Sequence, residues 1–275
     1  FTAEFVPTNG LYGVDVSANG SVALVSCYGI HYVYEIPSGN YRGTIPNYSQ
    51  NISQISGDGS KVVTGDFQGR FKVYEWNGAS YTQVFDHYTQ HSWVTALAIS
   101  EDGSTGMCGT LGFNPYRGKT ILYDLESYTV LWEYEEYGDE VSSCALSSDG
   151  SIAAASSWGQ YGGTFGDVLT IFNRGSSTPI FQLEDDIDEP GSIFGCDISA
   201  DGHYVTAGGK AVHARQSGNG GMLYSIKVND PLEHDAAVAA IFTPEEFIDP
   251  GSSLTPEASF FNIGNNIESF PVRCR

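Results

Sequence analysis

The sequence predicts an all-β protein whose first four-fifths consist of similar antiparallel sheets. Three observations lead to this fold class. Gly (33) and Tyr (17) are abundant among the 275 residues and only 16% are charged, a composition typical of many short strands joined by tight turns. One short phrase recurs with a period of about 45 residues. A further strand with a shared aromatic position follows each copy of that phrase.

Each copy of the phrase reads as a strand, a turn of the form Ser-x-Asp/Asn-Gly and a second strand. Asn or Asp followed by Gly tolerates the positive φ that a hairpin turn requires, so the turn chemistry fits its place between two strands. The copies are DVSANGSVALVSC at 15–27, QISGDGSKVVTGD at 54–66, AISEDGSTGMCGT at 98–110, ALSSDGSIAAASS at 145–157 and DISADGHYVTAGG at 197–209.

A third strand follows every copy, and a fourth strand follows four of them. The third strands are HYVYEI at 31–36, FKVYEW at 71–76, TILYDL at 120–125, LTIFNR at 169–174 and MLYSIK at 222–227, with the aromatic position at Tyr34, Tyr74, Tyr123, Phe172 and Tyr224. The fourth strands are predicted at 41–46, 80–86, 129–135 and 179–184. Four-stranded antiparallel sheets repeated at this period are typical of a β-propeller.

The fifth repeat lacks a fourth strand, and the chain opens with FTAEFV at 1–6. We expect residues 1–6 to supply the missing outer strand and close the ring, which leaves no open sheet edge. The sequence therefore predicts a closed five-bladed β-propeller over residues 1–230. In its hairpins and aromatic third strands this stretch resembles the WD40-like and quinoprotein-like families of bacterial propellers, without the Gly-His and Trp-Asp pairs of true WD40 repeats. Such propellers host binding scaffolds and enzymes alike, so the resemblance implies a fold and no activity.

Residues 231–275 contain no Ser-x-Asp-Gly turn and are predicted to begin an immunoglobulin-like sandwich. AAVAAIF at 236–242, LTPEASFFN at 254–262 and ESFPVRC at 268–274 read as strands. With a Pro-Gly turn at 250–251 and Asn-x-Gly at 262–264, the stretch resembles the opening of CARDB-type adhesion modules of secreted bacterial proteins. A complete sandwich needs about 100 residues. Further chain, packing on the propeller and strand addition from a neighbouring molecule remain open, and the last would make residues 236–275 the joint of a homo-oligomer or filament.

The charge balance bears on partners and location. The chain carries 33 acidic and 12 basic residues, a formal charge of -21, which repels phosphate backbones and anionic lipid headgroups. We therefore expect neither a nucleic-acid partner nor membrane insertion, and no apolar run approaches the roughly 18 residues of a spanning helix. The chain begins at Phe1 rather than Met. Removal of a signal peptide explains this, as would a recombinant fragment, and we expect a secreted, extracellular or cell-surface protein.

The cysteines are odd in number and show no C-x-x-C spacing, so neither a zinc site nor a disulfide framework is expected. Four of the five fall within apolar strand patterns, where a buried free thiol is the simplest interpretation. They are Cys27, Cys108, Cys144, Cys196 and Cys274.

In a propeller, the loops between second and third strands share one face with the blade-to-blade loops, and this face usually carries function. Here the second-to-third loops lengthen along the chain, at 112–119, 156–167 and 209–221. Aromatic rings with Arg and His can stack against a sugar or an aromatic ligand, and the alternative is that these loops only cover the channel mouth. The expected ligand-binding residues are Tyr116, Arg117, Trp158, Tyr161, Phe165, His213 and Arg215, with Phe113 nearby.

Two acidic blade-to-blade loops, EYGDE at 136–140 and EDDIDEPG at 184–191, suggest calcium, with solvated acidic loops as the alternative. The calcium candidates are Asp185, Asp186, Asp188 and Glu189. Catalytic carboxylates near the central channel, as in five-bladed glycosidases, are represented by Asp15 and Asp197. The equivalent position holds Gln or Ala in the other repeats. We find no nucleophile elbow, zinc-binding helix or phosphate loop.

These observations predict a non-enzymatic extracellular module for adhesion, surface display or assembly, with other protein subunits or a glycan as partners. The alternative is a hydrolase or lyase acting on an extracellular glycan, with Asp15 and Asp197 at the channel mouth. No cofactor other than calcium is expected.

Overall fold

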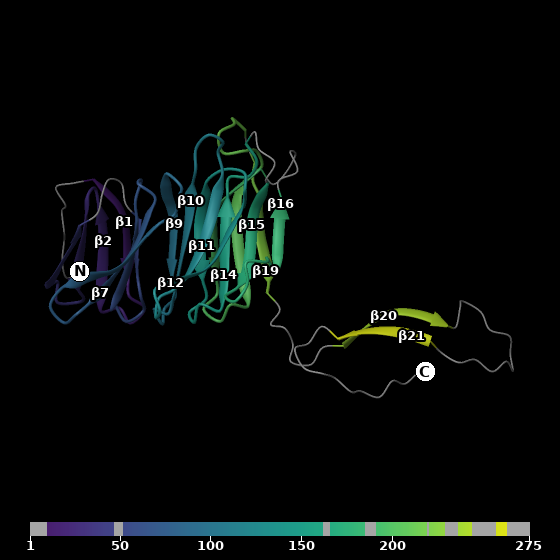
Figure 1. Cartoon of the computed structure of the whole chain (residues 1–275), viewed down its shortest axis with the longest axis horizontal. Coiled ribbons are helices and arrows are strands. Elements are labelled where there is room, and N and C mark those ends of the chain that lie inside the picture. Colours follow the sequence, from purple (N-terminus) through teal and green to yellow (C-terminus); the bar gives the residue numbers. More distant parts are fainter. Residues whose placement is uncertain are drawn as a thin grey trace. The chain divides into compact units, whose positions relative to one another are not determined.

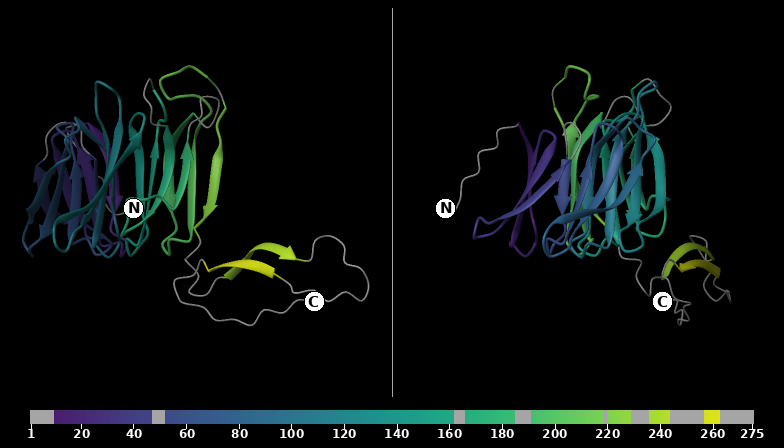
Figure 2. Two further views of the ribbon diagram at one scale, coloured as in Figure 1. Left: turned by 45° about the vertical axis from the view of Figure 1, so that its right-hand side comes forward. Right: turned by 60° about the vertical axis from the view of Figure 1, so that its left-hand side comes forward.

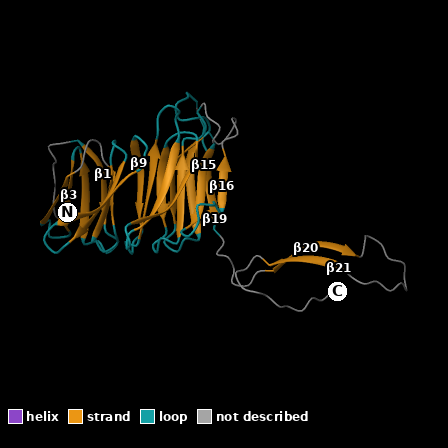
Figure 3. Cartoon of the chain, viewed as in Figure 1, coloured by secondary structure: helices purple, strands orange, loops and turns teal. Residues whose placement is uncertain are grey.

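The computed structural model describes residues 10–46, 52–161, 166–184, 191–218 and 220–228, together with the strands at 236–243 and 257–262. The described part of the chain consists of strands, turns and loops, without a helix (Figure 3). The chain divides into two compact units, Phe1–Lys227 and Val228–Arg275. Within the described residues no apolar helix of membrane-spanning length occurs.

The first unit contains five antiparallel sheets, each a meander in chain order (Figure 1). The first sheet has β1 (Leu11–Val16), β2 (Val22–Cys27), β3 (Ile30–Glu35) and β4 (Tyr41–Pro46). The second has β5 (Ile52–Ile55), β6 (Lys61–Gly65), β7 (Arg70–Trp76) and β8 (Tyr81–Tyr88). The third has β9 (Trp93–Ile99), β10 (Thr105–Leu111), β11 (Gly118–Asp124) and β12 (Thr129–Tyr137).

The fourth sheet has β13 (Val141–Leu146), β14 (Ile152–Ser157), β15 (Asp167–Asn173) and β16 (Phe181–Glu184). The fifth has β17 (Ser192–Ile198), β18 (Tyr204–Lys210) and β19 (Leu223–Lys227). The predicted third and fourth strands are therefore present within these sheets, with ends that differ by at most two residues. The predicted closing strand at 1–6 lies outside the described residues.

The alignment of the third strands by their aromatic residue is wrong for the fifth sheet. The aromatic residue of the third strand pairs with the second position of β2, β6, β10 and β14, as in Ala23 with Tyr34 and Ala153 with Phe172. In the fifth sheet the equivalent residue, Val205, pairs with Ile226, and Tyr224 lies two positions earlier on the strand. An aliphatic side chain packs at this position as well as an aromatic one does, so an aromatic residue alone does not identify the register of the third strand.

The recurring phrase forms the same hydrogen-bond network in all five turns. The Ser hydroxyl donates to the Asp or Asn side chain two residues later at 2.6–2.8 Å. That side-chain oxygen accepts the backbone N–H two residues further on at 2.8–3.0 Å, and the Ser oxygen accepts the N–H that starts the next strand. The repeated Ser-x-Asp/Asn-Gly motif thus satisfies the polar groups of each turn locally.

The sheets pack face to face in chain order, through their first strands and through apolar clusters between neighbouring faces (Figure 2). Val22 and Leu24 meet Val62 and Tyr74 between the first and second sheets. Phe71 stacks on Tyr123 between the second and third, with ring centroids 4.1 Å apart. Further clusters join the third to the fourth sheet and the fourth to the fifth. No contact of this extent joins the fifth sheet to the first among the described residues.

The cysteine prediction is confirmed for the four described cysteines, which are free thiols. Cys27, Cys108 and Cys144 are buried, and Cys196 is partly buried. Burial raises the pKa of the Cys108 thiol to about 12. These thiols therefore act as small apolar side chains in the sheets.

The second unit contains an antiparallel pair, β20 (Ala236–Thr243) and β21 (Glu257–Asn262). Both strands overlap predicted ones, and the predicted strand at 268–274 lies outside the described residues. The immunoglobulin-like character of this unit stays a prediction.

Candidate functional site on the upper face

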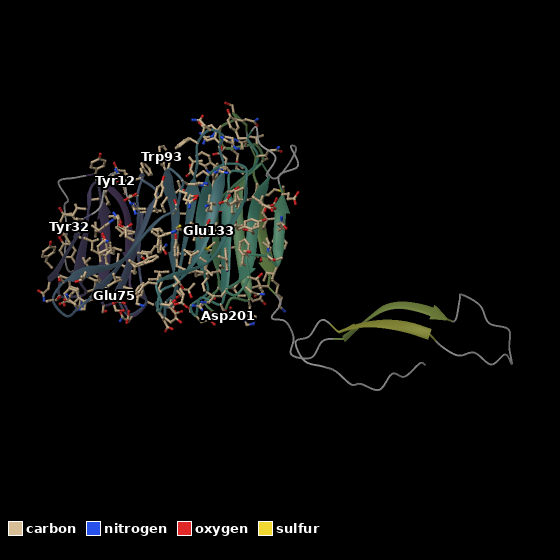
Figure 4. All side chains as sticks on the ribbon, viewed as in Figure 1. Tyr12, Tyr32, Glu75, Trp93, Glu133 and Asp201 are labelled. Carbon is tan, nitrogen blue, oxygen red and sulfur yellow. The ribbon has the colours of Figure 1, made fainter. Side chains whose placement is uncertain are left out.

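The loops between second and third strands lie at one end of the sheets, which we call the upper face: residues 66–69, 112–117, 158–161, 211–218 and 220–222, with the beginnings of β1, β5, β9 and β13. The Ser-x-Asp/Asn-Gly turns occupy the other end. Figure 4 shows this polarity, with Tyr12 and Trp93 near one end and Asp201 at the opposite end.

Arg215 organises the upper face. Its Nε and Nη2 donate to the two carboxylate oxygens of Asp139 at 2.7 and 2.8 Å. The guanidinium carbon lies 4.3 Å from the ring centre of Tyr116, 5.1 Å from that of Trp158 and 5.6 Å from that of Tyr161. A planar cation held by a bidentate ion pair and by ring faces has little freedom to rotate. The loops of three sheets are therefore fastened together at this point.

Asp139 is fully buried and ionised in this arrangement. Burial alone would raise its pKa, but hydrogen bonds from Arg215 and the backbone N–H of Glu140 hold the pKa below its usual value. His213 Nε2 lies 3.4 Å from the same carboxylate. Ser192 Oγ also links the loops of the fourth and fifth sheets, because it donates to the Trp158 carbonyl at 2.6 Å and accepts the Ala214 N–H at 2.7 Å.

A continuous run of ring contacts crosses the upper face from the second sheet to the fifth. Phe67 stacks on Trp93 at 4.5 Å, and Trp93 meets Phe113 edge to face at 4.9 Å. The run then passes through Phe113–Tyr116, Tyr116–Tyr161 and Tyr161–His213, with centroids 5.6, 5.8 and 4.8 Å apart. These geometries are the favourable offset and edge-to-face ones, so the rings support one another.

A cavity of about 220 Å³ opens beside this aromatic run. Its lining residues come from the first three sheets and from the corner before β13: Tyr12, Ile52, Phe67, Trp93, Val94, Thr95 and Glu140. A second cavity of about 210 Å³ shares Ile52 and Thr95 with it and continues between the first strands of four sheets. That channel is lined largely by small and polar side chains, among them Ser26, Ser53, Ser142 and Ser143.

Among the described residues that line the first of these cavities, which we call the upper cavity, Glu140 is the one with a carboxyl group. Burial, followed by the adjacent charge of Asp139, raises its pKa to about 7, and Arg215 opposes the shift. The two neighbouring acids thus differ, because Asp139 forms an ion pair with Arg215 whereas Glu140 lines the cavity.

Five of the predicted ligand-binding residues gather in one cluster: Tyr116, Trp158, Tyr161, His213 and Arg215. Arg117 lies on the same loop, where its backbone bridges to Gly112, and is exposed. Phe165 lies outside the described residues. Sequence reasoning missed Tyr12, Phe67 and Trp93. Phe67 sits in a short second-to-third loop and Trp93 begins a first strand, so topology alone places both on the upper face.

The acidic residues proposed for catalysis lie on first strands. Asp15 accepts the N–H of Ile55 in the next sheet at 2.9 Å and that of Val16 at 2.8 Å. Gln54, at the equivalent position of the second sheet, accepts the Ile99 N–H at 3.3 Å. This position therefore links neighbouring sheets. Asp197 is exposed and accepts the N–H of Ile198, and neither acid lines the two cavities described above.

The calcium candidates Asp185, Asp186, Asp188 and Glu189 lie outside the described residues. Within the described part of the chain no group of three or more His, Cys, Asp or Glu side chains could hold a metal ion. In the other acidic loop, at 136–140, Asp139 forms an ion pair with Arg215.

No protein-family model and no curated protein matches this chain. Among solved structures, hydrazine synthase from Kuenenia stuttgartiensis is similar, with a TM-score of 0.58 and 13% sequence identity. The similarity covers 75% of this chain and 57% of that one. At this identity it shows an all-β, propeller-like fold alone. Because 1306 solved chains match, the fold carries no conclusion about activity.

Proposed function

We propose that this protein is a non-enzymatic, extracellular recognition module that binds a ligand group in the upper cavity. The observation that carries the proposal is the aromatic wall formed by Tyr12, Phe67 and Trp93, together with the rigid cluster around Arg215. Concave sites with apolar walls and few polar groups are typical of ligand binding. Loops fastened to one another lose little freedom when a ligand binds.

Recognition fits this geometry better than glycan hydrolysis. A glycosidase needs two carboxyl groups on either side of the scissile bond. Asp139 and Glu140 have pKa values displaced in opposite directions, as such a pair would. Both oxygens of Asp139 are nevertheless engaged by Arg215 in a fully buried place, and of the described residues that line the cavity Glu140 is the one with a carboxyl group. One available carboxyl group supports binding and leaves hydrolysis without its second acid.

We also propose that the five sheets form a closed propeller and that residues 1–6 complete the fifth sheet. Among the described residues the fifth sheet has three strands where the others have four, and β19 is its last strand. Asp197 accepts the N–H of Ile198 as Asp15 accepts that of Val16, and Asp15 uses its second oxygen for the neighbouring first strand, so the same role is proposed for Asp197.

The second unit supports a role in assembly. A two-stranded sheet such as β20–β21 is marginal by itself. Strand addition from another copy would complete it, and deletion of 236–275 is then expected to leave a folded propeller that is strictly monomeric in analytical ultracentrifugation. Assembly of the truncated protein would refute the role of this segment.

The recognition proposal is tested with a mixed panel of neutral saccharides, aromatic compounds and organic cations, by saturation-transfer NMR. We expect at least one class to bind the wild-type protein and to lose binding in Trp93→Leu. The exposed Tyr41, at the start of β4, provides the control variant Tyr41→Leu. A panel that does not bind, or binding unaffected by Trp93→Leu, would refute the proposal.

A further inference from the structure

The upper cavity has the composition of a cation site. Tyr12, Phe67 and Trp93 come from three different sheets and line one small space. Tyr12 is 45% exposed, whereas Phe67 and Trp93 are partly buried and stack on one another. Ring faces carry negative electrostatic potential, and several rings around one point bind alkylated ammonium groups.

The charges around the cavity also favour a cation as the ligand. Glu140 supplies an acidic group, and the part of the lining that the structure describes contains neither Lys nor Arg. Arg215, the neighbouring cation, is already neutralised by the bidentate contact with Asp139. The whole chain has a formal charge of -21, which attracts cations and repels anions over longer distances.

The polar groups of the cavity suit a sugar less well. A sugar ring presents several hydroxyl groups, each of which loses water on binding and needs a new partner. Thr95 Oγ1 already donates to the Val141 carbonyl at 2.7 Å. Ile52 and Val94 contribute only apolar surface. At about 220 Å³ the cavity is also smaller than the roughly 300–1,000 Å³ of drug-sized sites.

We infer that the upper cavity binds a compact alkylammonium group of trimethylammonium type, in contact with the aromatic residues Tyr12, Phe67 and Trp93 and beside Glu140. This inference rests on the proposed recognition function and names its ligand class. The remaining charged or titratable groups near Glu140 are Asp139, Arg215 and His213.

A pair of matched ligands tests the role of charge on the unaltered protein. Choline and 3,3-dimethyl-1-butanol have nearly the same shape, but only choline is charged. We expect choline to bind at least ~10-fold more tightly in isothermal titration calorimetry, because only the cation gains from the rings and the carboxylate. Equal affinity, or no binding of choline, would overturn the inference.

Variants then assign the site. Trp93→Leu keeps an apolar wall but removes a ring, and we expect it to weaken choline binding at least ~10-fold. Glu140→Gln is expected to weaken binding and to abolish its pH dependence, whereas Glu126→Gln, in the exposed turn after β11, should change neither. Wild-type affinity in either cavity variant would overturn the inference.

The pH dependence has a defined sign. Choline favours the ionised form of Glu140, so wild-type affinity should rise as pH increases from 6 to 8, through the pKa of about 7. The same series on His213→Gln separates Glu140 from the histidine nearby, and a pH response that disappears in that variant counts against Glu140. Binding of a neutral saccharide that depends on Trp93, without choline binding, would refute the cation inference and leave the recognition function standing.

Discussion

The junctions between successive sheets differ sharply from the two faces at the ends of the series. At one register position of the third strand, the side chain packs against the next sheet and is fully buried in all four inner cases: His31, Phe71, Thr120 and Leu169. The equivalent residue of the fifth sheet, Leu223, is 83% exposed. On the opposite side, Val16 of the first sheet is 52% exposed, whereas the equivalent Ile55 of the second is 6% exposed.

The turns show the same difference. At the inner junctions, successive turns are joined by backbone hydrogen bonds of 2.8–3.2 Å, as from Gly57 N to the Glu101 carbonyl and from Ser148 N to the Ala200 carbonyl. The turn glycine also packs on the preceding sheet, as Gly150 does on Thr105. Gly20, in the first turn, has open space on that side.

Each repeat therefore carries two apolar faces, one for the sheet before it and one for the sheet after it. Among the described residues, one face of each kind has no partner sheet of this sort, on the first sheet and on the fifth. These two faces are the same two that meet at every inner junction, so they are expected to pack on one another and exclude water. Closure of the ring would bring them together within one molecule. Union between two copies would instead give an open, head-to-tail assembly.

A large effect is expected from breaking the ion pair between Arg215 and Asp139 on the upper face. Arg215→Met leaves the buried carboxylate of Asp139 without its partner, and we expect the free energy of unfolding to fall by ~3 kcal/mol. Arg117→Met on the same face is exposed and should change it by less than ~0.5 kcal/mol. Equal losses in urea unfolding would show that Asp139 does not depend on Arg215.

This ion pair also predicts a pH response. The pKa of Asp139 is lower in the folded state than in the unfolded state, where it is ~4. Its stabilising contribution is therefore present above pH ~4 and is lost as pH falls through the folded value. The advantage of the wild-type protein over Arg215→Met should shrink in acid, which urea unfolding across a pH series will measure.

Two leucines at one register position test closure directly. Leu169→Ala creates a cavity between the fourth and fifth sheets and should cost ~2–5 kcal/mol. If the fifth sheet packs on the first as we propose, Leu223→Ala should cost ~2 kcal/mol or more. A cost below ~0.5 kcal/mol in urea unfolding would mean that this face stays in water.

Two turn glycines offer a smaller, cleaner difference. Gly150 and Gly20 have φ of +66° and +68°, so Ala brings the same backbone strain at both. A methyl group at Gly150 would also lie 2.5 Å from Thr105 Cβ, whereas none of the atoms around Gly20 lies within 4 Å. If the fifth sheet packs on the first as we propose, Gly20 is covered and the two variants should cost about the same. A cost of Gly20→Ala that is ~1–3 kcal/mol below that of Gly150→Ala would indicate that Gly20 keeps its open space in solution, and thermal unfolding of both variants decides this.

The smallest effect concerns Asp15, which links the first and second sheets. Asp15→Ala removes the acceptor of the Ile55 N–H and should cost ~1 kcal/mol. If the ring closes as we propose, Asp197→Ala should cost about as much, and a clearly smaller cost would mean that Asp197 links no second sheet. Burial raises the pKa of Asp15, so the folded state binds its proton more tightly. Its contribution to stability therefore weakens as pH rises from ~4 through the raised value, and chemical unfolding at several pH values measures this.

Much of the fold was predictable because its determinants are local. Ser147, Asp149 and Gly150 satisfy one another within a single turn, so the motif identifies the hairpin wherever it occurs. The same locality placed the long loops, and with them Tyr161 and Arg215, on one face. The register of β19 was not predictable from its aromatic residue, because Ile226 packs equally well in that place.

The sequence by itself determined the strands, the turns, the number of repeats and the end of the molecule at which aromatic loops gather. Only the tertiary structure decided that Arg215 pairs with Asp139, 76 residues away, and that Tyr12, Phe67 and Trp93 share a cavity with Glu140. The physical reason is range. Turn and strand preferences arise from neighbouring residues, whereas the protonation of a buried acid depends on which distant side chains exclude water from it.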